Sequence, residues 1–515
     1  MRKFLKIVFS RMWLVAFAII AQLILSTALP YILNYFHPEI FGKLYLQLDL
    51  IFKIIGLIMI LIIINSEMIT EGKMAWVLLF LIFPLFAFII YRMFVWYKAP
   101  KRHRRFYAQV KKKVADINKR SSKEIEKLKT DIDHVSGQFE YIYQTSNLKT
   151  YSNSNVKYLD SGEAFYNNLL EELNKAQKYI FMEYFIIERG QMWNKILNIL
   201  QSKVKAGVEV RVMYDDLGTI HKLPYNYAKR LRKMGIKCVK FNSFVPIMSA
   251  LHNNRDHRKI TVIDGKVGFV SGLNIADEYI NVVQKFGHWK DSGVKISGEA
   301  VKSLLMMFLQ LYNAQTQRME DYDHYLKDIK PVKANGYVCP YGDGPRYFYD
   351  DYIAENVYLN MINQAEKYIW ITTPYLIIDN KLSNAICSAA KRGVDVRIIT
   401  PHIPDKKYIF MLTRSCYRKL QQAGVKIFEY EKGFVHSKQV ICDDKLGIVG
   451  TINFDYRSLM HHYECGVLMY NTDCLKDIKK DFEKMFSTSI NMKDFKQNTL
   501  VRLYCAIVKV FTPML

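Results

Sequence analysis

The sequence lacks the patterns of a disulfide-stabilised or zinc-binding protein. Its 515 residues include eight cysteines, and no two of them form a CxxC pair. Scattered cysteines of this kind are expected to be reduced thiols in the core or on the surface. The His461-His462 pair has no cysteine or carboxylate cluster at metal-ligand spacing along the chain. We therefore expect no metal site and no other cofactor.

Acidic residues are also scarce relative to basic ones. Lysine and arginine total 73 against 48 acidic residues, so the formal net charge is +25. Such an excess suits a polyanionic partner, either a nucleic acid or an anionic membrane surface, and charge alone does not choose between them.

The length of the chain allows two or three domains.

Long apolar runs occur only in the first hundred residues, where residues 12–33, 44–64 and 74–91 form three stretches. Each has about 18 to 22 residues, enough to cross a hydrocarbon core of about 30 Å. The first could instead be a cleaved signal peptide, and Asp49 and Lys53 could shorten the second into a re-entrant segment. We predict a membrane anchor of two or three transmembrane helices over residues 1–97. Aromatic residues near the predicted ends fit interfacial belts: Trp13, Trp76, Tyr91, Trp96 and Tyr97.

Basic clusters flank this region on both sides. One precedes the first stretch, and a denser one follows the third and continues through residues 111–113. Three spans would put the clusters on opposite sides of the membrane, whereas two spans would leave both in the cytoplasm. We expect the large domain on the cytoplasmic face, after a basic juxtamembrane linker over residues 98–150.

One short motif occurs twice. Residues 257–264 and 436–443 both fit the spacing H-x-K-x-x-x-x-D. A single copy is weak evidence, but here each histidine is also followed by Gly at +11, Val at +13 and Asn at +17. The shared register indicates that one half of an active site is present twice. The motif residues are His257, Lys259, Asp264, His436, Lys438 and Asp443, and the downstream asparagines are Asn274 and Asn453.

The repeat extends beyond the motif. Residues 174–180 resemble 363–369, and residues 205–211 resemble 391–397. A period near 180 residues is too long for a solenoid, whose units have about 20 to 50 residues. We predict two homologous domains, 151–330 and 331–515, that pack together with the site at their interface.

Each half alternates strand-like and helix-like segments. Residues 179–187 and 368–377 have the composition of buried strands. Residues 208–214 and 394–400 have it too, and follow helices that a glycine ends, Gly207 or Gly393. This alternation predicts an α/β fold with mixed sheets flanked by helices, the two halves packed face to face.

The repeated residues suit chemistry at a phosphodiester. One imidazole can attack phosphorus, and the other can protonate the leaving alcohol and later deprotonate the incoming one. The two lysines, together with Asn274 and Asn453, can hold the phosphate oxygens. Each His and Lys are two residues apart, so both would leave one face of a strand. The two aspartates lie past the strand, where we interpret them mainly as anchors of the turn.

Each imidazole also needs an acceptor that fixes its tautomer. Asp291 in HWKDSGV and Glu464 in HHYECGV occupy matching places in the repeat. We therefore predict that these two carboxylates orient the histidines.

These residues resemble the phospholipase D superfamily, whose bilobal enzymes carry duplicated HKD motifs. The N-terminal apolar region, GTINFDYRS at 450–458 and VKVFTPML at 508–515 narrow the resemblance to bacterial cardiolipin synthases, over nearly the whole chain. That family condenses two phosphatidylglycerol molecules into cardiolipin and glycerol. The resemblance implies two phospholipase D-like halves behind transmembrane helices in a bacterial cell membrane, with anionic phospholipids and not nucleic acid as partners.

By the same analogy, His257 would be the nucleophile and His436 the acid and then the base. Two departures from the family pattern leave the headgroup open. Ser271-Gly272 stands for the usual Gly-Gly pair, and Lys290 stands for arginine before Asp291.

Three other functions fit the same residues. A phospholipase D would use water as the acceptor, and a membrane-tethered nuclease would need base-stacking aromatics beside a basic groove. A lipid-binding protein without catalysis would be marked by degraded motifs, and both motifs are intact here.

Residues 500–515 form either an interfacial amphipathic helix or a helix packed on the domain.

Overall fold

A computed structural model describes residues 35, 38–95, 101–119, 130, 135–243 and 253–514. The chain divides into two compact units. A helical unit comprises Met1–Ala99, Phe244–His252 and Ala506–Leu515, and an α/β unit comprises Pro100–Ser243 and Asn253–Cys505. The first predicted apolar stretch, residues 12–33, lies outside the described residues, as do Trp13, Trp96 and Tyr97.

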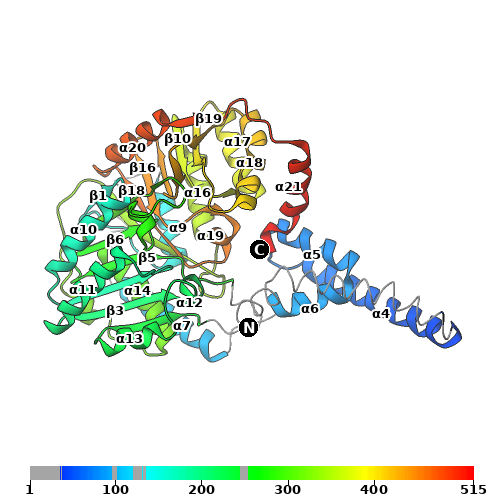
Figure 1. The fold of residues 1–515 in the computed structure, drawn as a ribbon, viewed down its shortest axis with the longest axis horizontal. Helices are drawn as coiled ribbons and strands as arrows, with labels where there is room; N and C mark the ends of the chain where they lie inside the picture. The colour runs from blue at the N-terminus through cyan, green and yellow to red at the C-terminus, as the bar shows by residue number, and fades with distance from the viewer. Residues whose placement is uncertain are drawn as a thin grey trace. The chain divides into compact units, whose positions relative to one another are not determined.

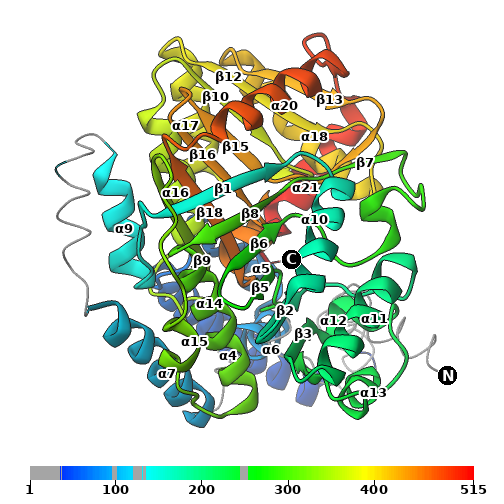
Figure 2. The same cartoon turned by 90° about the vertical axis from the view of Figure 1, so that its left-hand side faces the viewer.

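The α/β unit contains two mixed sheets (Figures 1 and 2), and seven strands follow the same order in both, while the second sheet has one additional edge strand, β19. The first sheet runs β1 (Ser154–Leu159), β8 (Gly293–Gly298), β6 (Val267–Ser271), β5 (Lys259–Ile263), β2 (Tyr179–Tyr184), β3 (Glu209–Asp215), β4 (Lys237–Phe241). The second runs β9 (Tyr337–Asp343), β18 (Glu464–Tyr470), β16 (Leu446–Gly450), β15 (Gln439–Cys442), β10 (Tyr368–Thr372), β12 (Asp395–Pro401), β13 (Lys426–Tyr430), β19 (Ser489–Asn491). The predicted α/β fold of two similar halves is confirmed.

Helices flank both sheets and make the crossovers between parallel strands. The strands β2, β3 and β4 are parallel, as are β10, β12 and β13, and parallel neighbours need such crossovers. The first half has α10 (Gly162–Lys175), α11 (Gln191–Lys205), α12 (Asp216–Thr219), α13 (Tyr227–Lys233), η3 (Asp277–Ile280), α14 (Val301–Thr316) and α15 (Asp323–Leu326). The second has α16 (Ile353–Gln364), α17 (Asn380–Lys391), α18 (Lys407–Gln422), α19 (Tyr456–Met460) and α20 (Leu475–Ser487).

The glycine stop signals lie where the sequence predicts them. Helix α11 ends at Lys205 and α17 ends at Lys391. Gly207 and Gly393 follow with φ of +86° and +93°, a left-handed conformation that glycine adopts without the steric cost of a Cβ. The chain then enters β3 and β12, so the same local chemistry places the same strand in each half.

The two halves meet through β6 and β8 of the first sheet and β16 and β18 of the second (Figure 2). Two short parallel pairings also cross between them. Strand β7 (His288–Lys290) pairs with β14 (Gly433–Val435), and Asp256 pairs with Tyr463 in an isolated bridge. Each crossing lies one residue before a motif histidine, which fixes the position of that histidine against the opposite half.

The described part of the predicted linker forms two helices of the α/β unit. Helix α7 (Lys101–Lys119) packs on α14 and buries Tyr107, Val110 and Val114. Helix α9 (Ser136–Ser146) packs on α16 and β9. Residues 101–146 thus include more packed structure than a linker implies, and the predicted domain boundaries stay predictions.

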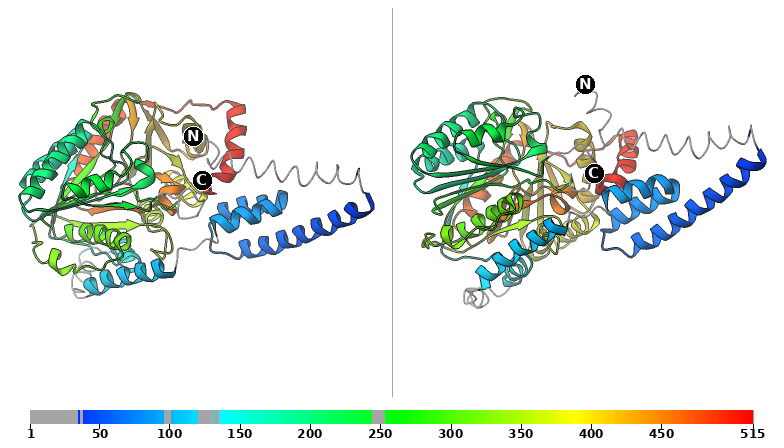
Figure 3. Two further views of the ribbon diagram at one scale, coloured as in Figure 1. Left: turned by 60° about the horizontal axis from the view of Figure 1, so that its bottom comes forward. Right: turned by 90° about the horizontal axis from the view of Figure 1, so that it is seen from below.

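The helical unit contains α4 (Pro38–Ile64), α5 (Thr70–Ile82) and α6 (Pro84–Phe94), which lie side by side in Figure 3. Residues 44–64 lie within α4, as one continuous helix. Residues 74–91 are instead divided, because Pro84 has no N–H to donate and begins a new helix. Within the described ranges, no helix combines the length and apolar character needed to cross a bilayer.

The C-terminal segment is helical, as predicted. Helix α21 (Thr499–Phe511) continues into the short 3-10 helix η4 (Thr512–Met514). Phe511 and Met514 pack against the apolar cluster of α4, α5 and α6, which includes Trp76 and Tyr91. This packing lies within the helical unit, so the two predicted alternatives for residues 500–515 stay predictions.

Candidate active site

The crossings between the halves place each motif histidine beside a carboxylate of the other half. The backbone N–H of His257 donates to the Tyr463 carbonyl over 2.9 Å, and the next residue after Tyr463 is Glu464. In the same way, the N–H of His436 donates to the Lys290 carbonyl over 2.7 Å, one residue before Asp291.

The side chains complete both pairs. Nδ1 of His257 lies 2.8 and 3.0 Å from the two oxygens of Glu464, and Nδ1 of His436 lies 2.6 Å from Oδ2 of Asp291. Both carboxylates are fully buried. An ionised carboxylate accepts hydrogen bonds only, so it holds the imidazole proton on Nδ1 and leaves the Nε2 lone pair free. The two predicted carboxylates are thus the histidine partners in space, and each serves the opposite half.

The histidines lie just outside the strands in which the sequence places them. Strand β5 begins at Lys259 and β15 begins at Gln439, so His257 and His436 belong to the segments that lead into these strands. The local reason is that the residues before them pair with the other half and not with their own sheet.

The two motif lysines are buried beside the histidines. Nζ of Lys259 donates to the carbonyl of His257 over 2.6 Å, and Nζ of Lys438 donates likewise to the carbonyl of His436. Burial lowers the pKa of Lys259 to about 8 and that of Lys438 to about 7. Burial therefore disfavours the charged form of both lysines, and a bound anionic phosphodiester would favour it again.

Burial and the nearby lysine charges also keep the two imidazoles neutral. Burial, with the charge of Lys438, lowers the pKa of His436 to about 4. Burial, with the charge of Lys259, lowers the pKa of His257 well below its usual range. Asp291 is also buried, but His436 and Lys438 hold its pKa below the usual value. At neutral pH both rings are thus in the form that can attack or accept a proton.

The aspartates of the two motifs have a different task. Asp264 accepts from the backbone N–H groups of Gln177, Lys178 and Tyr179, over 2.7 to 2.9 Å. Asp443 accepts from residues 366, 367 and 368 in the same way, over 2.8 to 2.9 Å. Both have positive φ, 53° and 52°. Each aspartate connects the turn after its motif strand to the start of β2 or β10. These contacts agree with a role as an anchor of the turn.

The two asparagines differ. Oδ1 of Asn274 accepts from the N–H of Ile186 over 3.0 Å, and its Nδ2 donates to the Tyr279 hydroxyl over 2.6 Å. Asn453 is 5% exposed, and its Oδ1 has no partner among the described residues. Their predicted contact with phosphate stays a prediction.

A pair of buried polar residues supports each motif, and its chemistry changes between the halves. Arg258, inside the first motif, is fully buried with Nη1 4.0 Å from Glu183. The equivalent residues in the second half are Ser437 and Thr372, whose hydroxyls lie 3.0 Å apart. The sequence analysis missed these pairs, although the HRK and HSK versions of the motif signal that its central residue differs.

Aromatic rings enclose the histidines unequally. The ring of His436 has centroids of Tyr279, Trp289 and Phe434 at 5.2 to 5.8 Å. The ring of His257 has Phe185 at 5.1 Å and a second imidazole, His462, at 5.5 Å.

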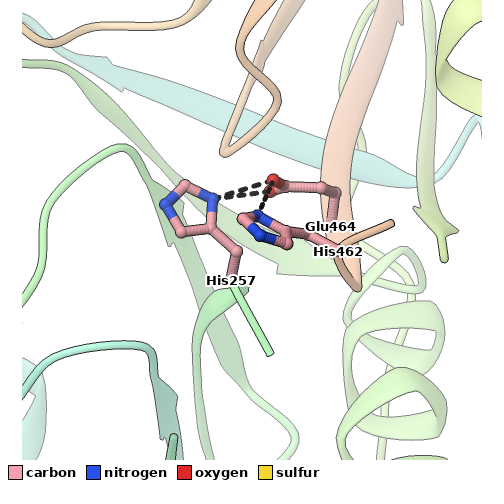
Figure 4. Close-up of side chains that lie close together, drawn as sticks. All are labelled: His257, His462 and Glu464. Carbon is pink, nitrogen blue, oxygen red and sulfur yellow. Dashed lines mark hydrogen bonds and ion pairs between the residues drawn. The ribbon is translucent and has the colours of Figure 1, made fainter. Parts of the chain in front are cut away.

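His462 is the other residue that the sequence analysis missed at this site. It is 8% exposed, and its Nδ1 lies 3.7 Å from Oε1 of Glu464 (Figure 4). Ligand atoms of His257, His462 and Glu464 all lie within 4.8 Å of one another. This cluster is not visible in the spacing along the chain, because His257 lies more than two hundred residues before His462.

The comparison with known families matches both halves. The profile described as "Cardiolipin synthase, PLD-like domain" covers residues 169–301 and 358–486. The chain belongs to this family. Both motifs, Asp291 and Glu464 lie within the matched residues, so the match includes the whole constellation described above.

The chain is similar to other proteins over most of its length. The chain is 34% identical to a cardiolipin synthase of Alkalihalophilus pseudofirmus, over 86% of this chain and 88% of that one. It is 42% identical to an uncharacterized protein of Streptococcus mutans, over 88% of this chain and 99% of that one. A phosphatidylserine synthase of Haemophilus influenzae, 17% identical, superposes with a TM-score of 0.56 over 73% of this chain and 98% of that one, which shows the shared fold.

Proposed function

We propose that this protein is a cardiolipin synthase, which transfers a phosphatidyl group from one phosphatidylglycerol to another and releases glycerol. The observation that carries the proposal is the pair of neutral imidazoles, each held at Nδ1 by a buried carboxylate of the other half. Family membership and the named relatives support phospholipids as the substrates.

The first step transfers the phosphatidyl group to the protein. Nε2 of His257 attacks phosphorus and forms a P–N bond, while the P–O bond to glycerol breaks. His436 donates the proton that the glycerol oxygen needs, having gained it when the anionic lipid binds, because a nearby anion raises the pKa of a histidine. Glu464 stabilises the charge that develops on the ring of His257.

The second step repeats the chemistry in reverse. A terminal hydroxyl of the second phosphatidylglycerol enters where glycerol left, and His436 takes its proton. The new P–O bond forms as the P–N bond breaks, so cardiolipin leaves and both imidazoles return to their starting state. Lys259 and Lys438 face the phosphate and offset its negative charge, and their lowered pKa values rise as it binds.

We propose further that the helical unit attaches the enzyme to the bacterial cell membrane, with the α/β unit on the cytoplasmic face. Large apolar side chains of this unit are exposed, including Leu57 at 60% and Leu61 at 56% on α4 and Leu81 at 67% on α5. Exposed apolar surface of this kind is typical of a membrane interaction. The basic residues of α7 would suit anionic headgroups.

The test uses the purified full-length protein in liposomes that contain labelled phosphatidylglycerol. We expect the wild type to form cardiolipin and free glycerol, and His257→Ala and His436→Ala to form neither above background. His324→Ala, which changes an exposed histidine of α15, is the matched control and should retain full activity. Phosphatidic acid as the sole product would show hydrolysis and contradict the transferase proposal. The liposomes also test attachment, because the protein should float with them after a high-salt wash.

A further inference from the structure

His462 lies in the site with one long contact, 3.7 Å from its Nδ1 to Oε1 of Glu464. Neither ring nitrogen has a hydrogen-bond partner among the described residues, although the residue is only 8% exposed. A buried polar atom without a hydrogen-bond partner costs free energy. Its ring faces the carboxylate that orients His257 (Figure 4). The pattern indicates that a further group binds here.

The three side chains are arranged around a common point. Oε1 of Glu464 lies 2.8 Å from Nδ1 of His257 and 3.7 Å from Nδ1 of His462. Ligands at about 2.0–2.1 Å around a tetrahedral zinc ion are separated by about 3.3 Å, so small side-chain rotations would bring these atoms to bonding distance. Two imidazole nitrogens and one carboxylate oxygen are a ligand set that zinc and similar borderline divalent ions prefer.

We infer that His257, His462 and Glu464 form a binding site for a divalent transition-metal ion of the zinc class, and that the bound ion inhibits the enzyme. The metal-binding part stands on the geometry alone, whereas inhibition rests on the proposed function. The described residues supply three ligands, and the fourth position would be taken by water or by a phosphate oxygen of the lipid.

Inhibition follows from the tautomer of His257. A neutral imidazole has one proton and one lone pair, so a metal ion on Nδ1 forces the proton onto Nε2. The nitrogen that would attack phosphorus then has no lone pair to offer. The ion also takes Glu464 out of its hydrogen bond with the ring. The lone pair on Nε2 and the contact that orients the ring are therefore lost together.

The surroundings of His436 provide an internal comparison. In the aligned stretches HWKDSGV and HHYECGV, Trp289 occupies the position of His462. Trp289 lies beside His436 at a centroid distance of 5.2 Å, as His462 lies beside His257 at 5.5 Å. An indole offers no lone pair to a metal, so the inferred site belongs to the His257 side.

The experiment measures binding and activity on full-length protein purified without a polyhistidine tag and treated with chelator. Binding of Zn²⁺ is followed by calorimetry, and Co²⁺ by its visible absorption. We expect about one ion per chain with wild type, and at least tenfold weaker binding by His462→Asn. His461→Asn, a substitution of the adjacent histidine, is the matched control and should bind like wild type. Mg²⁺, which prefers oxygen ligands, should not compete.

The activity assay compares each protein with its own rate in chelator. Zinc should inhibit wild type and His461→Asn, and at least tenfold more zinc should be needed to inhibit His462→Asn. Equal zinc binding by wild type and His462→Asn would overturn the site. Site-specific binding without loss of turnover would overturn inhibition. A protein that binds zinc as expected but never converts phosphatidylglycerol would contradict the proposed function and leave the metal site supported.

Discussion

The buried lysines show how single residues trade stability for function. Burial lowers the pKa of Lys438 to about 7 from 10.5 in the unfolded chain. Below pH 7 Lys438 is charged in both the folded and the unfolded state, so the folded protein bears the full free-energy cost of burying this charge. Between pH 7 and 10.5 the lysine is protonated only in the unfolded state, so its destabilising effect declines as pH rises and is absent above 10.5.

We therefore predict that Lys438→Met stabilises the protein while abolishing transfer. The gain in unfolding free energy should be about 1–3 kcal/mol at pH 6, because a neutral side chain of similar length removes a poorly compensated buried charge. The gain should be smaller at pH 9. Thermal unfolding at both pH values measures it. Lys229→Met, on an exposed position, is the control, and a lower melting temperature for Lys438→Met at pH 6 would contradict the argument.

At the scale of elements, the motif aspartates hold the turn that positions each catalytic strand. We predict that Asp443→Ala lowers the unfolding free energy by about 2–4 kcal/mol, because three backbone N–H groups lose a charged acceptor and alanine tolerates the positive φ poorly. Asp443→Asn, which retains one acceptor and the same conformation, should lose less. Urea unfolding measures both variants.

The same variants test whether Asp443 takes part in the chemistry. A turn anchor predicts that Asp443→Asn retains activity in proportion to its folded fraction. Loss of turnover in fully folded Asp443→Asn would instead favour a direct catalytic role. Asp264→Asn should behave like Asp443→Asn, since Asp264 makes the same three contacts in the first half.

These elements also show which features a sequence can predict. Strands and glycine stops depend on neighbours in the chain, so the repeat predicted them in both halves. The turn position of Asp264 and Asp443 was predicted in the same way, although the backbone groups that they bind lie far along the chain. The division of residues 74–91 at Pro84 was also within reach, because proline disrupts a helix through its own missing N–H. His462 and the Arg258–Glu183 pair were not, since their partners lie far along the chain and meet them only through tertiary packing.

At the scale of the whole molecule, the two halves form one catalytic unit, because each motif histidine is oriented by a carboxylate of the other half. Matching positions in a repeat do not say whether Glu464 serves His257 or His436, and only the parallel pairings between the halves decide it. Each motif histidine pairs with a carboxylate of the other half and not of its own. Separation of the halves should therefore disable both imidazoles at once.

This arrangement predicts strong non-additivity between the two carboxylates. Glu464→Gln and Asp291→Asn should each lower turnover about 100-fold or more, because the amide no longer fixes the tautomer or stabilises the imidazolium. The double variant should be little slower than either single one, since both imidazoles act in the same steps and the loss of one already stops them. Initial rates of cardiolipin formation in liposomes measure all four proteins, after melting temperatures show that each variant is folded. Losses that multiply, to about 10,000-fold in the double variant, would mean that the two pairs act independently and that the site is not the shared unit that its geometry implies.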